Sequence, residues 1–139
     1  MRRFSPGSGP PVSLFRQEAP EEIGVMEPQD TPHGQVAFRF ASQLVAEEFD
    51  GAHQMLSSTA KREWPARLLE STYRKMVECF APTNVMVMNT MEEWPAKRSN
   101  DIGWAYAAIA GESESEAVTV IVCEEGGQHA IRSIEWGRP

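Results

Sequence analysis

The stretch DIGWAYAAIAG, residues 101–111, decides the fold. In an extended strand, side chains two residues apart share one face of the sheet. Gly103 and Ala105 therefore lie on one face, whereas Trp104 and Tyr106 lie on the opposite one. A face built from glycine and alanine lets a helix approach closely. The stretch thus predicts a strand with a helix packed on its small-residue side.

The sequence on both sides of this stretch also alternates between apolar and polar residues. Further strands are predicted over residues 84–94, 117–123 and 128–136, with the quoted strand covering residues 103–110. The connections between them are short and contain proline, glycine or clustered polar residues. Short connections join antiparallel neighbours, so we predict a four-stranded antiparallel meander.

Helical periodicity precedes the strands. A long helix is predicted over residues 32–49, followed by a short helix that ends near Ser57. A third helix is predicted to begin around Pro65 and to close before Pro82, because proline cannot continue a helix. We therefore predict an α+β domain over residues 32–139, with three N-terminal helices packed on one face of the sheet.

Residues 1–31 have a different composition, with five of the ten prolines and little capacity for a core of their own. We interpret this segment as a Pro/Gly-rich arm. Its apolar residues, which include Leu14 and Phe15, suffice for docking on an existing surface, and the alternative is a disordered arm.

Composition excludes several classes of function. A net charge of −7 argues against sequence-independent binding of nucleic acid, because phosphates are repelled. The longest apolar run, residues 117–123, is far too short to cross a bilayer, so we expect no membrane partner. The N-terminus lacks the apolar region of a signal peptide, which favours a cytoplasmic protein. Cys79 and Cys123 have no metal-ligand spacing, so we expect reduced, half-buried thiols, no metal and no cofactor.

The order of these elements resembles the NTF2-like superfamily, also described as cystatin-like or SnoaL-like. The resemblance covers residues 32–137 and rests on EEFDGAHQMLSS (47–58), WPARLLESTYRKM (64–76) and AIRSIEW (130–136). It implies a curved sheet that wraps around the long helix and encloses a cavity. It also implies homodimers formed through the outer face of the sheet. Members of this superfamily include enzymes, transport factors and bacterial immunity proteins, so the fold alone implies no activity.

The third strand supports an association surface independently of the resemblance. Val118 and Val120 lie on one face of that strand, and Thr119 and Ile121 lie on the other, so both faces are largely apolar. One layer of helices covers only one face. We expect the arm or a second subunit to cover the other.

Five residues are candidates for a pocket or an interface: Tyr73, Asp101, Trp104, Tyr106 and His53. We expect Trp104 and Tyr106 to form a partner-facing patch, and the alternative assignment makes them cavity lining. Asp101 follows an asparagine and is typical of a turn cap, and His53 is typical of a surface position. No pair among these residues matches the acid and base of a known enzyme of the superfamily.

We therefore predict a non-enzymatic, homodimeric binding protein whose partner is another protein or a small apolar ligand. An immunity-type role is one form of this hypothesis and rests on analogy. The alternative is a cofactor-independent lyase or isomerase acting on a small hydrophobic substrate. In that case Asp101 or His53 would be the base, and Tyr73 or Tyr106 the proton donor.

Overall fold

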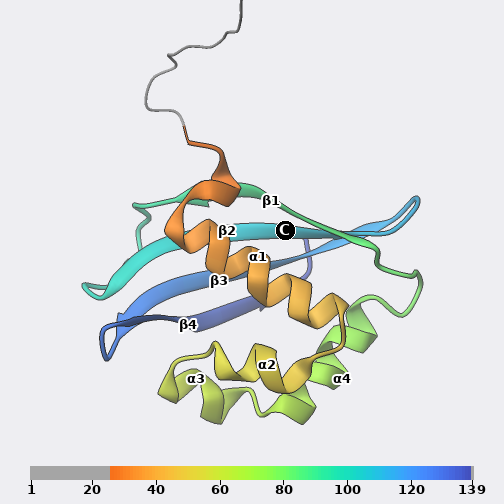
Figure 1. The fold of residues 1–139 in the computed structure, drawn as a ribbon, viewed down its shortest axis with the longest axis horizontal. Helices are drawn as coiled ribbons and strands as arrows, with labels where there is room; N and C mark the ends of the chain where they lie inside the picture. Colours follow the sequence, from red (N-terminus) through yellow and green to blue (C-terminus); the bar gives the residue numbers. More distant parts are fainter. Residues whose placement is uncertain (1–25, 139) are drawn as a thin grey trace, which may run out of the picture.

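Residues 26–138 are described by a computed structural model, which has the α+β architecture with a four-stranded antiparallel sheet (Figure 1). The strands follow one another in the sheet in chain order, β1-β2-β3-β4. The elements are η1 (Pro28–Asp30, a 3₁₀ turn), α1 (Pro32–Val45), α2 (Phe49–Gln54), α3 (Ser58–Glu63), α4 (Ala66–Met76), β1 (Asn84–Met91), β2 (Asp101–Ala110), β3 (Ser115–Glu125) and β4 (Gln128–Trp136). None of the helices within residues 26–138 is long and apolar enough to cross a membrane.

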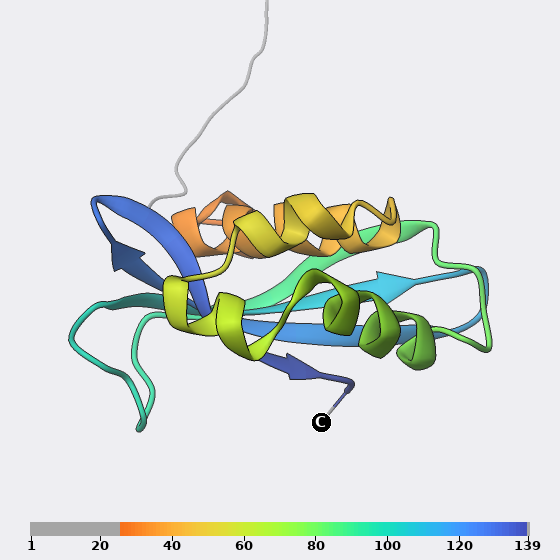
Figure 2. The same cartoon turned by 90° about the horizontal axis from the view of Figure 1, so that it is seen from below.

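The core lies between the helices and one face of the curved sheet. α1 contacts all four strands and lies over this face, with α2 next to it, whereas α3 contacts β4 and α4 packs against α2 (Figure 2). Five large side chains at the centre of the core have less than 2% of their surface exposed: Phe40, Leu44, Leu69, Ile109 and Ile131. We call the sheet face toward α1 the inner face and the opposite one the outer face.

The prediction of three helices was wrong, because residues 26–138 contain four α-helices. The predicted long helix ends at Val45 instead of residue 49, because Glu47 takes a left-handed conformation with φ of 61°. The amide of Glu48 donates to the carbonyl of Gln43, and the amide of Glu47 donates to that of Leu44. These two bonds make a Schellman motif, which ends a helix.

The extra helix is α3. Ser57 has extended backbone angles, and its hydroxyl accepts a hydrogen bond from the amide of Ala60, so it caps α3. The predicted short helix corresponds to α2, and the cap at Ser57 starts a separate helix, α3, which ends before Trp64. α4 then begins at Ala66, as the proline at 65 led us to expect.

The small-residue face of β2 points inward, as predicted. Gly103, Ala105 and Ala107 are all buried under the helices. The imidazole of His33, near the start of α1, packs directly against Gly103, and a Cβ atom added at this glycine would collide with the ring. Burial also lowers the pKa of His33, so the ring packs here in its neutral form.

The N-terminal boundary differs in detail from the predicted arm. Residues 26–31, assigned to the arm by composition, include the turn η1, which packs on α1 and β1. Thr31 is buried and caps α1 by accepting from the amide of Gly34. The remainder of the predicted arm, residues 1–25, lies outside the described residues.

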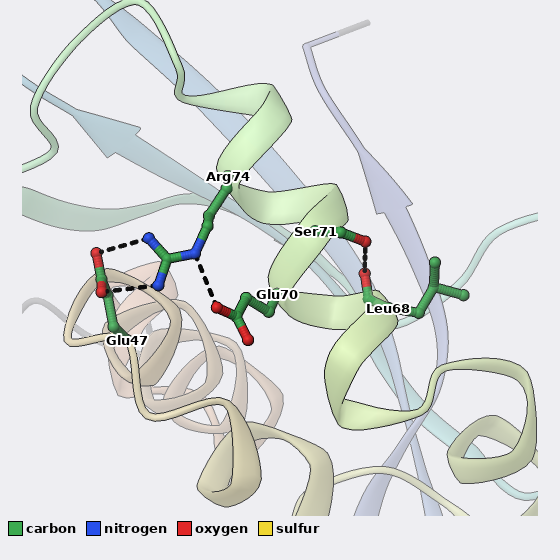
Figure 3. Close-up of polar contacts among 5 residues, drawn as sticks. All are labelled: Glu47, Leu68, Glu70, Ser71 and Arg74. Carbon is green, nitrogen blue, oxygen red and sulfur yellow. Dashed lines mark hydrogen bonds and ion pairs between the residues drawn. The ribbon is translucent and has the colours of Figure 1, made fainter.

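An ion-pair network joins the end of α1 to α4 (Figure 3). The guanidinium of Arg74 donates to Glu70 at 3.0 Å, one turn earlier in α4, and to Glu47 at 3.0 Å. Arg74 also lies over the ring of Phe49, 5.5 Å from its centroid. All three charged side chains are substantially exposed, so solvent screens these pairs and the network contributes little to stability.

Replacing Glu47 tests the cost of its left-handed backbone. Glu47→Gly and Glu47→Gln both remove the ion pair with Arg74, but only glycine relieves the conformation. We expect Glu47→Gly to be more stable than Glu47→Gln by about 1 kcal/mol in urea unfolding. Equal stability of the two variants would show that the backbone at this position is not strained.

A second prediction concerns the contact between His33 and Gly103. Gly103→Ala places a methyl group against the imidazole ring with no room for it, and overpacking of this kind costs about 1–3 kcal/mol. We expect the cost to fall by at least about 1 kcal/mol in a His33→Ala background, because the clash is then absent. The measurement is a double-mutant cycle by urea unfolding. An equal cost in both backgrounds would contradict the close approach.

Candidate functional site

The outer face of the sheet carries apolar side chains that the helices leave uncovered. Trp104 on β2 lies between Met91 on β1 and Ile121 on β3 in the strand register. One step along, Tyr106 lies beside Thr119 of β3. Because directly paired residues share a face, the outer patch consists of Met86, Met91, Trp104, Tyr106, Ala108 and Ile121.

Trp104 and Tyr106 form the centre of the outer patch. Their rings are stacked, with centroids 6.5 Å apart and an angle of 24° between the planes. Both side chains are partly exposed, as is Ile121 next to them. The structure therefore places the two aromatic residues on the face away from α1 instead of in the core. A rigid aromatic pair of this kind is typical of a recognition surface.

Methionines extend the patch toward the edge of the sheet. Met86 has 50% of its surface exposed, and Met88, at a bulge of β1, has 54%. β1 is an edge strand, so this part of the patch is open on one side. Methionine side chains adapt to the shape of a partner, which suits an association surface.

Asp101, another of the candidate residues, lines a polar pocket of about 560 Å³. This pocket lies between α3 and the ends of β2, β3 and β4. Its lining is mostly charged or hydroxylated and comes from Ser57, Thr59, Glu63, Arg98, Ser99, Asn100, Asp101, Cys123, Glu124, Glu125, Arg132 and Ser133. Four carboxylates and two guanidinium groups are present, so the lining has two more acidic groups than basic ones.

Asp101 is held at the floor of this pocket by Arg132. The Nε and Nη2 atoms of Arg132 donate to the two carboxylate oxygens, each at 2.6 Å, and the amide of Arg98 donates at 2.8 Å. The Asp101 side chain is fully buried and that of Arg132 is 16% exposed. The hydrogen bonds from Arg132 hold the pKa of Asp101 below its ordinary value despite burial. The carboxylate is therefore a structural anion and a poor general base.

Two other groups of the pocket are also unsuited to catalysis. Cys123 is buried, and burial raises the pKa of its thiol, so it stays protonated and weakly nucleophilic. Glu125 accepts hydrogen bonds from the hydroxyl of Ser58 at 2.7 Å and from its amide at 3.0 Å. The expected half-buried state of both cysteines was wrong, because Cys79 is exposed and Cys123 is buried.

His53 and Tyr73 lie away from both surfaces. The Nε2 atom of His53, on α2, is 3.2 Å from the carbonyl oxygen of Lys61. Tyr73, on α4, is 2% exposed and packs on the ring of Phe49 at 5.9 Å between centroids. Burial and the charge of Glu47 raise the pKa of Tyr73 to about 12. Of the five candidate residues, the structure brings only Trp104 and Tyr106 into ring contact.

Sequence reasoning missed Arg132 and the exposed methionines. Arg132 is an extra residue at a bulge between β3 and β4, where the register shifts between Ile121 and Val122. Strict alternation cannot place such a residue. Its partner Asp101 is 31 residues away in the sequence, so no local signal could identify the pair. For Met86 and Met88 the signal was the run VMVM in residues 85–88.

Comparisons with known proteins add no assignment. No protein-family model matches the chain, and a search of curated proteins finds no significant similarity. Within residues 26–138, no three histidine, cysteine or acidic side chains are grouped so that they could hold a metal ion.

Removing Arg132 tests the role of the pocket. Arg132→Met leaves Asp101 as a buried, unpaired carboxylate, which should lower the free energy of unfolding by about 3 kcal/mol at pH 7. The paired carboxylate has a lowered pKa, so its contribution is present above pH ~4 and is lost as the pH falls further. We therefore expect the difference between the wild type and the variant to shrink in urea unfolding below pH ~4.

The control for this prediction is the double variant Asp101→Asn, Arg132→Met. It removes both charges, so it should recover much of the stability lost in the single variant. A single variant as stable as the wild type at pH 7 would show that the pair is not structural.

Proposed function

We propose that this protein is a non-enzymatic binding protein that forms a homodimer through the outer patch. The observation that carries the proposal is the stacked, partly exposed pair of Trp104 and Tyr106 at the centre of a bare sheet face. Such a face stays in water only at a free-energy cost, and a dimer formed around a two-fold axis would bury the same patch on both copies.

The size of the face fits a dimer. Four strands with 8 to 11 residues each make a face of roughly 20 Å by 30 Å at the usual strand spacing and rise. The accessible surface of such a face approaches the ~800 Å² per partner of a standard interface. Glu135 lies beside the patch on β4 and would form part of its rim, whereas Asn89 lies within it, next to Tyr106.

The alternative, a lyase or isomerase, receives less support from the same geometry. It needs an ionisable group that faces an apolar pocket and is free to exchange a proton with a substrate. Asp101 is engaged by Arg132, the ring of His53 lies against the Lys61 carbonyl, and Tyr73 is packed on Phe49. Tyr106 lies on the outer face, away from these groups.

An NTF2-like relationship is part of the proposal. What supports it is the order of elements, with helices first and then a curved antiparallel meander over which the first helix lies. In that setting the outer face would be the dimer surface.

The dimer is tested by adding charge to the patch. Ile121→Glu and Tyr106→Glu should each weaken self-association at least about tenfold, because a charge would be buried at the centre of the interface. The measurement is sedimentation velocity of the full chain over a range of concentrations, with the fold checked by circular dichroism.

Leu68→Glu is the matched control. Leu68, on α4, is also an exposed apolar residue at 42%, but it lies outside the outer patch. It should leave the dimer unchanged. A wild-type chain that remains monomeric at the highest concentration, or equal effects of Leu68→Glu and Ile121→Glu, would refute the proposed dimer.

A further inference from the structure

We propose that the proline-rich segment of residues 6–15 binds the outer patch of its own chain and so competes with the second copy. The regulatory part of this inference rests on the self-association proposed above. The binding part rests on the chemistry of the segment, on the aromatic pair, and on the point at which the described chain begins.

The aromatic pair is suited to proline. Proline-rich segments adopt an extended helix with little loss of entropy on binding, and their rings pack on exposed, parallel aromatic side chains. Trp104 and Tyr106 offer two such faces side by side. The segment PGSGPPVSLF contains three prolines and ends in Leu14 and Phe15, which provide further apolar surface.

Charge favours the same contact. Residues 1–17 contain Arg2, Arg3 and Arg16 and no acidic residue, whereas the whole chain has a net charge of −7. One acidic side chain is placed on the outer face by the strand register: Glu135 of β4 is paired with Thr119, which is paired in turn with Tyr106. The arginines on either side of the segment therefore favour its contact with this acidic chain, whereas a second acidic copy is repelled.

Residues 16–25, which connect the segment to the described chain, are long enough for the segment to reach the outer patch. The described chain begins at Met26, which is 59% exposed, and continues into η1, which contacts β1. β1 is the edge strand, so the chain has only one sheet edge to pass. Residues 16–25 span up to about 35 Å when extended, which exceeds the roughly 20 Å width of the sheet.

Competition has a measurable consequence. If the segment covers the patch in about nine of ten monomers, each monomer is competent to pair for about one tenth of the time. A dimer needs two free faces, so its apparent dissociation constant rises about a hundredfold. Weakening the segment should therefore tighten the dimer.

The first experiment measures this in the full chain. Pro10→Ala/Pro11→Ala/Phe15→Ala should lower the dimer dissociation constant at least about tenfold in sedimentation velocity, and Pro20→Ala, outside the segment, should not. An unchanged constant would refute the inference and leave the proposed dimer intact. A weaker dimer would also refute it, because the segment would then be part of the interface.

The second experiment detects binding directly and does not depend on the dimer. A nitroxide is attached to the cysteine introduced in the full-length variant Ser5→Cys/Cys79→Ser, since Cys79 is exposed and Cys123 is buried. At concentrations where the chain is monomeric, NMR should show broadening of the indole signal of Trp104. Trp64 and Trp136, which pack on each other on the helix side, should be unaffected.

The outcomes separate the two proposals. Broadening confined to Trp104 that disappears in the triple alanine variant supports the inference, even if the chain never dimerises and the proposed dimer fails. Absent broadening, or equal broadening of all indoles, overturns the inference whatever the oligomeric state.

Discussion

The close approach of α1 to the small-residue face of β2 is the constraint on which the rest of the structure depends. Gly103, Ala105 and Ala107 leave room for the helix, and the His33 ring fills the space above the glycine. Since side chains alternate along a strand, this contact also determines what faces outward. Trp104 and Tyr106 are on the outer face because their neighbours must be small. The core and the candidate interface are thus two results of one packing requirement.

β-Bulges interrupt this alternation of side chains. Two of them lie beside residues that line the polar pocket. Register shifts occur beside Asp101 in β2 and beside Arg132 in β4. β3 lies between these strands, and its residue Cys123 is paired with both Asp101 and Ala130. The ion pair therefore reaches across the central strand and ties three strands together at one end of the sheet. Bulges often re-aim side chains in this way, and here they bring two opposite charges into a buried contact.

The sequence was sufficient to predict the strands of the sheet. It was insufficient to predict the end of α1 and the partner of Asp101, which depend on tertiary contacts. Period-two alternation predicted the four strands, their antiparallel order and the face of Trp104, because each is a local property. The end of α1 was predicted four residues too late, because a glutamate at 47 gives no signal for a left-handed backbone, whereas glycine would have. The partner of Asp101 is 31 residues away and lies at a bulge, so neither spacing nor alternation could identify Arg132.

The chemistry of the outer patch favours specific binding over non-specific hydrophobic association. Its apolar side chains are interrupted by the exposed polar side chains of Asn89 and Glu135, which keep the face compatible with water. A net charge of −7 opposes contact between copies, so apolar burial around Trp104 must exceed this repulsion for a dimer to form. Salt screens the repulsion between copies, and it would also screen the attraction of the arginines that flank the proposed segment. In the proposed scheme both effects would favour the dimer at higher ionic strength. Electrostatics would then set the balance between the two proposed occupants, and the aromatic pair would provide the affinity common to both.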